Sequence, residues 1–406
     1  MSGTGPLTGY KVLDLTQFES GTVCTETLAW MGAEVWKVER PHTGELGRYS
    51  IAEPGVDTYG FIIMNMNKKS ITCNMKTSKG LELMKKLVKQ ADVLIENMGP
   101  GSIERLGLAY DVCKELNPRL IYAQIKGFGT DGPFADYPAF APIGQAVGGV
   151  PAMTGFPDSQ PCQPGVNVGD SGTGYLCAMG IIAALLQREH TGKGQRIEVT
   201  LQDACVAFGR ANWEPYYNNG RVAPKRVGNG LPMEDVGPAG MYPCKPFGPN
   251  DYVHIYCSRH PGSNQFANLC RIIGREDLLS DPRMATPRSR YLVKDELDAI
   301  ISQWTGQHTK QEAMDILCRE DIPAGAVLDI DDITHDEYLV KRGVMTDVEH
   351  RQRGRLRVPG LAVRMDGNTV AYETSPELGE HNAEVYGGLL GLTEAELEQL
   401  RHEKVI

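Results

Sequence analysis

The chain has 406 residues, 41% of them hydrophobic, and a formal net charge of −10. A chain of this length is expected to bury roughly three quarters of its unfolded surface, which favours a well-packed globular protein. The acidic balance argues against a nucleic-acid partner, since phosphate binding needs a concentrated basic face. No apolar run reaches the ~20 residues of a membrane span and the N-terminus has no signal pattern, so we expect a cytoplasmic protein with no membrane partner.

The ten cysteines are widely spaced, and neither a Cys-x-x-Cys pair nor a zinc-like Cys/His spacing occurs. The pattern indicates mostly reduced cysteines buried as small apolar side chains, and it predicts no metal site.

The N-terminal part opens with a predicted strand at 12–15, a helix at 22–31 and a strand at 34–39, which together form a βαβ unit. The turn after the first strand contains Gly21 but lacks the other glycines of the dinucleotide-binding fingerprint. Glu39 at the end of the second strand therefore reads as an ordinary strand-end charge rather than a ribose-binding acid.

Further strands are expected at 71–74, 93–95, 120–125 and 196–201, with a helix over 81–88. Strands that alternate with helices predict a doubly wound parallel sheet, a Rossmann-like fold whose ligands bind at the carboxyl ends of the strands. Five cations follow or border these strands and could surround one crevice for a multiply phosphorylated ligand. Each could equally be a solvated surface charge; they are Arg40, Lys68, Lys69, Arg105 and Lys126.

The pattern changes near residue 216, where a polar stretch over 217–235 predicts a linker or long loop. A hairpin with strands at 240–244 and 252–257 then begins a smaller α+β domain. Capping boxes at Thr309/Glu312 and Thr393/Glu396 predict two helix starts. We divide the chain into a large domain (1–215), a linker and small domain (216–325) and a return segment that completes the large domain (326–406).

The stretch from 167 to 190 places Asp170 between glycines, directly ahead of a long apolar run that ends at Gly192. This pattern predicts a buried helix with Asp170 at or near its N-cap, where the helix dipole would favour the ionised carboxylate. Small neighbours would leave room for a ligand. Asp170 is thus either an accessible nucleophile or a simple helix cap.

Nine motifs, in order along nearly the whole chain, resemble the family III CoA-transferases. This family includes formyl-CoA:oxalate and carnitine CoA-transferases and, as a divergent branch, α-methylacyl-CoA racemase. The motifs lie at 12–16, 32–39, 67–70, 96–101, 126–129, 169–170, 191–195, 322–325 and 378–381.

The resemblance implies that Asp170 attacks an acyl-CoA thioester and later carries CoA as an aspartyl-CoA thioester. Coenzyme A is then a substrate, and no tightly bound cofactor is expected. The resemblance also implies CoA contacts from six residues: Phe18, Glu19, Arg40, Asn97, Arg105 and Lys126. A shielding loop would correspond to the segment from Gly237 to Gly240.

The family also implies an interlocked homodimer in which each chain forms a ring around the other. A monomeric mass at micromolar concentration would contradict this expectation. Some family members consist of two different chains, so a related second subunit remains an alternative.

Two departures bear on the substrate. The chain has Glu19 where formyl-CoA transferase has Gln, and an apolar run at 138–141 where that enzyme has Lys-x-Tyr-Glu. Lost polar partners disfavour oxalate, whose desolvation would go uncompensated. With Phe140 and Ala141 lining the acyl pocket, we expect a larger donor such as succinyl-CoA and a bulkier acceptor acid.

A second carboxylate on the substrate would need a cation, and Arg48 is the candidate, against the alternative of a solvated surface arginine. The racemases carry a His at the position of Phe140, and phenylalanine cannot abstract a proton. A racemase-like isomerase would need a base from elsewhere in the chain.

Overall fold

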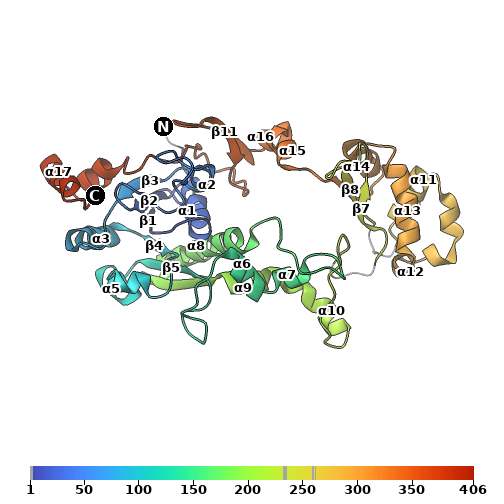
Figure 1. Cartoon of the computed structure of the whole chain (residues 1–406), viewed down its shortest axis with the longest axis horizontal. Helices are drawn as coiled ribbons and strands as arrows, with labels where there is room; N and C mark the ends of the chain where they lie inside the picture. The colour runs from blue at the N-terminus through green and yellow to red at the C-terminus, as the bar shows by residue number, and fades with distance from the viewer. Residues whose placement is uncertain (1–2, 232–235, 258–259, 261) are drawn as a thin grey trace. The chain divides into compact units, whose positions relative to one another are not determined.

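The computed structural model describes residues 3–231, 236–257, 260 and 262–406 (Figure 1). The chain forms two compact units, and the first combines residues 1–150, 163–208 and 337–406. The second unit consists of residues 151–162 and 209–336. The domain limits expected at 216 and 326 stay a prediction.

The first unit contains a six-stranded parallel sheet in the order β3-β2-β1-β4-β5-β6. Its strands are β1 (Lys11–Asp14), β2 (Glu34–Glu39), β3 (Lys69–Thr72), β4 (Val93–Glu96), β5 (Ile121–Lys126) and β6 (Gln195–Thr200). The strand order reverses between β1 and β4, which makes the carboxyl ends of these two strands the expected ligand crevice. The predicted doubly wound sheet is confirmed.

The helices of this unit lie between and beyond the strands. They are α1 (Ser20–Trp30), α2 (Tyr59–Met64), α3 (Ser78–Gln90), α4 (Ser102–Arg105), α5 (Tyr110–Leu116), α6 (Ala141–Val147), α8 (Thr173–Thr191), α9 (Leu201–Phe208), α16 (Glu337–Lys341) and α17 (Glu394–His402). A short helix α7 (Val150–Met153) crosses the boundary between the units, and β10 (Met345–His350) pairs antiparallel with β11 (Gly354–Pro359).

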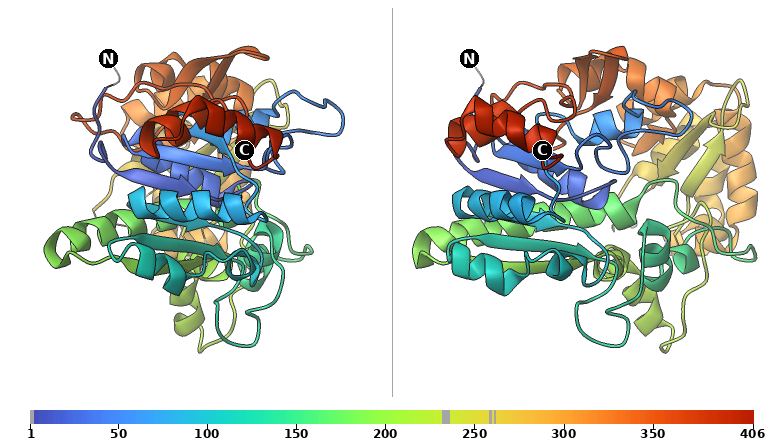
Figure 2. Two further views of the ribbon diagram at one scale, coloured as in Figure 1. Left: turned by 90° about the vertical axis from the view of Figure 1, so that its left-hand side faces the viewer. Right: turned by 60° about the vertical axis from the view of Figure 1, so that its left-hand side comes forward.

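Alternating side chains of the sheet feed two separate cores, as the two-residue period of a strand requires. Val12 of β1 packs in the core that contains α1 and α8, whereas its neighbour Leu13 packs in the core that contains α3. Helices therefore cover both faces of the sheet (Figure 2). The C-terminal residues Val405 and Ile406 belong to the α3 core, so the end of the chain is part of the first unit.

One expected strand is displaced. Residues 71–74 were expected as a strand, but β3 begins two residues earlier, because Lys69 and Ser70 pair in register with Trp36 and Lys37 of β2. Lys69 and Ser70 are polar, so the apolar pattern of the sequence did not include them in the strand, although both pair with β2.

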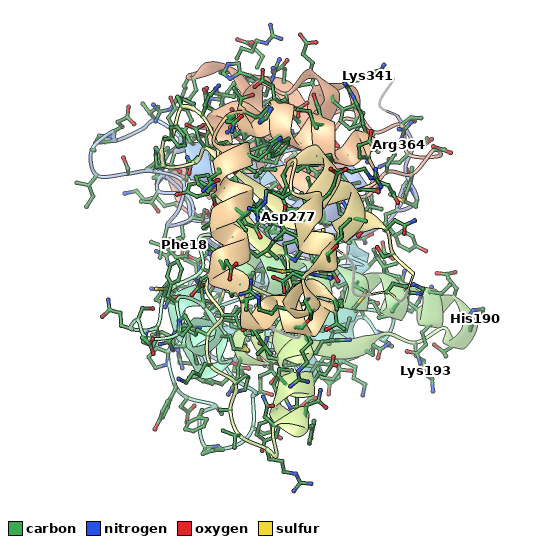
Figure 3. The ribbon with its side chains drawn as sticks, turned by 90° about the vertical axis from the view of Figure 1, so that its right-hand side faces the viewer. Phe18, His190, Lys193, Asp277, Lys341 and Arg364 are labelled. Atoms are coloured by element: carbon green, nitrogen blue, oxygen red, sulfur yellow. The ribbon has the colours of Figure 1, made fainter. Side chains whose placement is uncertain are left out.

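Helix α8 is long and apolar enough to cross a membrane by length and composition alone, but half of its most apolar stretch is buried within the chain. Cys177, Ile181 and Leu185 pack against the sheet and α1, as expected for the core helix of a globular unit. His190 and Lys193 lie at its C-terminal end (Figure 3), where the positive charge of Lys193 complements the helix dipole.

The second unit carries the predicted hairpin, β7 (Ala239–Pro243) paired with β8 (Tyr252–Tyr256), and a third strand, β9 (Ala324–Ala326). Its helices are α10 (Trp213–Asn218), α11 (Gln265–Ile272), α12 (Pro287–Leu292), α13 (Lys294–Thr305), α14 (Lys310–Arg319) and α15 (Ile330–His335). Both predicted capping boxes are confirmed. The predicted linker over 217–235 overlaps the end of α10, and residues 232–235 lie outside the described part.

A set of buried ion pairs lies near the carboxyl ends of β1 and β2. Lys68 binds the Asp14 carboxylate at 3.2 Å, and both side chains are fully buried. Lys37 binds Glu45 at 3.0 Å in the same region. Burial opposes ionisation of Asp14, but the charges of Lys68 and Lys37 keep the pKa of this carboxyl below its usual value.

We predict that Lys68→Met lowers the free energy of unfolding by about 3–5 kcal/mol, because it leaves a buried Asp14 carboxylate without its partner. The neighbouring Lys69 makes half-exposed ion pairs with Glu34 and Glu384. Lys69→Met should therefore cost only ~0–1 kcal/mol. Urea unfolding of both variants checks the difference, and equal losses would contradict it. The double variant Asp14→Asn/Lys68→Met should recover part of the loss.

Candidate active site

A cavity of about 850 Å³ opens at the carboxyl ends of the first four strands. Leu15 follows β1, Arg40 follows β2, Asn74 follows β3 and Met98 follows β4, and all four line it. Arg105 of α4 and Lys404 near the C-terminus also contribute to the wall. The cavity is large enough for an extended cofactor-sized molecule and has several cations on its rim.

A second pocket of about 270 Å³ contains Asp170. Gln17, Met98 and Gly99 line both pockets, so the two spaces adjoin at the point where the strand order reverses. The two pockets together can hold a long ligand with one end among the cations and the other at Asp170.

The turn between β1 and α1 supplies Phe18 and Glu19 to the smaller pocket. Phe18 is 45% exposed and has a left-handed φ of 59°, which is uncommon for a bulky side chain. The Thr22 hydroxyl donates to the Phe18 carbonyl, and the Asn97 side chain bonds the Gln17 backbone on both its N–H and C=O. These contacts fix the turn, so Asn97 both lines the pocket and holds its neighbour in place.

Asp170 does not cap α8. It is the third residue of a π-helical turn, Val168–Gly172, whose N-cap is Asn167, and α8 begins at Thr173. Asp170 therefore lies near the start of the helical run 168–191, as expected, but its side chain makes no capping hydrogen bond. A Cβ on Gly172 would lie 2.4 Å from the Phe208 ring, and one on Gly169 would lie 3.0 Å from the Gln145 side chain. The neighbouring glycines thus allow close packing of the turn, where we had expected room for a ligand.

The pKa of Asp170 is not lowered, as a position at the helix N-terminus would predict, but raised. Burial and the charge of Glu19 raise the pKa of Asp170 to about 6, although the Asn167 side chain acts in the opposite direction. Asp170 accepts one long contact from Asn167 at 3.5 Å. Glu19 accepts two short hydrogen bonds of 2.6 Å, from Asn167 and from Ser171. Asp170 is therefore the less restrained of the two carboxylates in this pocket.

Phe140 is 68% exposed and lines the pocket, where its ring makes an edge contact with Phe18 at 6.3 Å between centroids. Ala139 also lines the pocket. Ala141 does not, because it is the first residue of α6 and is buried against the turn at Gly169. The expectation that Ala141 lines the acyl pocket is wrong.

The expected cluster of five cations divides among separate places. Arg40 and Arg105 are exposed and line the larger cavity. Lys126 lines the smaller pocket, but its ammonium group binds Glu96 at 2.6 Å and the Met98 carbonyl at 2.8 Å. Lys68 is buried on Asp14, and Lys69 pairs with Glu34 and Glu384, so neither lines either pocket.

Arg48 is neither a substrate cation nor a solvated arginine, because only 1% of it is exposed. Its guanidinium binds Glu39 at 2.7 Å and Asp57 at 2.9 Å, and it stacks on the Phe61 ring at 3.9 Å. It lines neither pocket. The Glu39 carboxylate is therefore bound by Arg48 within the protein.

Gly237 and Gly240 belong to the second unit. The Gly237 carbonyl accepts a hydrogen bond of 2.7 Å from the buried Arg290 side chain, and Gly240 lies in β7. Their expected role in shielding an intermediate stays a prediction.

Sequence reasoning missed several residues of the two pockets. Gln17 and Met98 lie next to predicted residues, and their position after β1 and β4 was a usable signal. His42, Lys76 and Lys404 line the larger cavity, and Leu46 and Tyr137 line the smaller one. Only the tertiary structure brings Lys404 there.

The profile of CoA-transferase family III matches residues 7–382. A protein of Streptomyces coelicolor named formyl-CoA:oxalate CoA-transferase is 39% identical, covering 98% of this chain and 99% of that protein. One of the same name from Rhodopseudomonas palustris is 37% identical, covering 98% and 96%.

Solved structures agree with this relationship. A CAIB/BAIF family protein from Brucella suis superposes with a TM-score of 0.81 at 31% identity, covering 95% of this chain and all of that one. The Rv3272 protein of Mycobacterium tuberculosis gives a TM-score of 0.78 at 27% identity, covering 94% and 99%.

We predict that the pH profile of kcat/KM has an acid limb near the raised Asp170 pKa of about 6, since only the ionised carboxylate is nucleophilic. Glu19→Gln removes the negative charge that raises this pKa and keeps an acceptor for Asn167 or Ser171. The acid limb should therefore move to lower pH in this variant.

Glu198→Gln is the matched control, because Glu198 bonds Thr130 and Arg196 and lines neither pocket. Its pH profile should coincide with that of the unmodified enzyme. An acid limb that stays in place in Glu19→Gln would show that Glu19 does not set the ionisation of Asp170.

Proposed function

The chain belongs to CoA-transferase family III, and from this premise we propose that it moves CoA from an acyl-CoA to a carboxylic acid through covalent intermediates on Asp170. The observation that carries the proposal is the position of Asp170, a carboxylate with one long hydrogen bond, in the pocket that adjoins the larger, cation-rimmed cavity. The extended CoA chain would cross from one to the other at Gln17, Met98 and Gly99.

The proposed reaction needs no other reagent. An Asp170 oxygen attacks the thioester carbonyl, the C–S bond breaks, and the CoA thiolate leaves a mixed anhydride behind. The thiolate then attacks the aspartyl carbonyl, and the donor acid leaves as its carboxylate. The acceptor carboxylate reverses these steps on the aspartyl-CoA thioester. Each intermediate retains the activation of the thioester, so ATP is not required.

Five further residues have assigned roles in this scheme. Burial and, after it, the charge of Glu19 keep the Asp170 carboxylate basic, and basicity strengthens a carboxylate nucleophile. Phe18 and Phe140 provide an apolar wall beside the acyl group. Arg40 and Arg105 supply positive charge for the phosphate end of CoA.

We further propose a donor larger than formyl-CoA, with succinyl-CoA as the first choice, and an acceptor acid bulkier than oxalate. Lys126 is the one cation among the described residues that line the smaller pocket, and Glu96 neutralises it. Two carboxylates, Glu19 and Asp170, already lie there. A compact dianion would therefore be repelled and poorly solvated at this place.

A formyl-CoA:oxalate activity is the second candidate, because the relatives carry that name at 36–39% identity. A racemase-like reaction has no support from the pocket residue Phe140, which carries no titratable group. Homodimer formation, a second subunit and a cytoplasmic location stay predictions from the sequence.

We predict that Asp170→Ala abolishes transfer, because the nucleophile is lost while the π-helical turn keeps its neighbours. Mass spectrometry of the purified chain with acyl-CoA should show no adduct in this variant. More than trace activity in a folded Asp170→Ala protein would exclude the covalent mechanism.

The same residue gives an independent stability test. Since the folded-state pKa of Asp170 is raised, the ionised carboxylate destabilises the folded state fully above pH 6 and not at all below its unfolded value near 3.8. The free energy of unfolding of Asp170→Asn should therefore be ~1–2 kcal/mol higher than that of the unmodified enzyme at pH 8. The gain should disappear as the pH falls below 4.

The substrate proposal is tested by kcat/KM for succinyl-CoA with a series of mono- and dicarboxylic acids, against formyl-CoA with oxalate. We predict that the succinyl-CoA pairs are preferred by at least ~10-fold, equivalent to about 1.4 kcal/mol. Preference for the oxalate pair would establish the second candidate and show that cations outside the described pocket hold the dianion.

A further inference from the structure

Lys404, the third residue from the C-terminus, has an unusual backbone conformation. Its φ is +57°, in the left-handed region where glycine is favoured and a long side chain is strained. The side chain is exposed, and Lys404 lines the larger cavity, as Asn74 and Lys76 do. Among the described residues, no hydrogen bond or ion pair engages its ammonium group.

The surrounding chain holds this conformation in place. The Lys404 N–H donates to the Arg401 carbonyl at 3.0 Å, and the Val405 N–H donates to the Leu400 carbonyl at 2.9 Å. The Asn74 N–H donates to the Val405 carbonyl at 2.7 Å, which ties the C-terminus to the end of β3. Val405 and Ile406 are only 2% and 4% exposed. The backbone that carries Lys404 is therefore fixed relative to the cavity.

The charges around the cavity favour an anion. Arg40, Lys76 and Arg105 are exposed cations on its lining. The two carboxylates on the lining, Glu39 and Glu45, are bound to Arg48 and Lys37 and do not neutralise them. A fourth cation, from the far end of the sequence, adds to this positive wall.

We propose that Lys404 is a CoA-binding residue whose ammonium group binds a phosphate group of the substrate. The proposal rests on the proposed function, in which this cavity holds the phosphate end of CoA. The left-handed backbone holds Lys404 at the cavity, where its ammonium group would supply a charge-assisted hydrogen bond to the ligand. CoA offers two sources of this chemistry, its 3′-phosphate and its diphosphate.

The test is Lys404→Gly, which removes the charge and relieves the strain. We expect the KM for the acyl-CoA donor to rise by roughly 10-fold, the size of one charge-assisted contact, with kcat at saturation unchanged. The thermal midpoint should stay the same or rise, since glycine is favoured at this φ. If Lys404 had only a structural role, its replacement would lower the stability of the protein. A raised KM for the donor with an unchanged or higher thermal midpoint therefore indicates a binding role.

Comparison with dephospho-CoA thioesters identifies the phosphate. If Lys404 binds the 3′-phosphate, the KM for the CoA thioester rises in Lys404→Gly until it is close to the KM for the dephospho-CoA thioester. If it binds the diphosphate, both KM values rise in parallel. Lys404→Arg keeps the charge and should retain most of the affinity.

Lys404→Gly removes a positive charge and relieves a left-handed residue, and each of these changes has its own control. Lys79→Ala removes a cation that pairs with the adjacent Glu403 but lines neither pocket. Asp321→Gly relieves a left-handed residue (φ 61°) in the second unit. Neither control should alter the KM for the donor. Should Lys404→Gly fold poorly, Lys404→Gln replaces it in the same comparison.

Unchanged KM values for both thioesters in Lys404→Gly would overturn the proposal while leaving the proposed function intact. Absence of acyl-CoA turnover in the unmodified enzyme would overturn both.

Discussion

The buried ion pair between Asp14 and Lys68 is the contact on which the arrangement of the site depends. Asp14 is the last residue of β1, and Lys68 also donates to the Thr22 carbonyl in the first turns of α1 at 3.1 Å. The pair therefore fixes both ends of the turn that carries Phe18 and Glu19. Removing one partner would leave a buried charge, so this region tolerates loss of a single member poorly.

Two further buried ion pairs, Lys37–Glu45 and Arg48–Glu39, lie beside the larger cavity. Lys37 bonds the Thr16 carbonyl as well as Glu45, and Arg48 bonds Glu39. Glu39 and Glu45 line the cavity, but their charges are used within the protein. The charges of Glu39 and Glu45 are thus neutralised within the protein, whereas the exposed cations Arg40 and Arg105 remain available to a ligand.

The sequence predicts the features that depend on local patterns and misses those that depend on packing. Strand β2 and both capping boxes follow from periodicity and from short-range hydrogen bonds. The π-helical turn at Asp170 depends on contacts with Gln145 and Phe208, which lie far away in the chain. Burial of Arg48 and the place of Lys404 likewise depend on tertiary contacts that no local pattern encodes.

The same difference explains why the electrostatics of Asp170 were predicted with the wrong sign. A helix N-cap would lower the pKa of the carboxyl, whereas burial and a neighbouring carboxylate raise it. Glu19 cannot move away to relieve the repulsion, because Asn167 and Ser171 bind both of its oxygens. The protein therefore holds Asp170 as a carboxyl group with a pKa raised to about 6, which lowers the stability of the fold and would strengthen Asp170 as the proposed nucleophile.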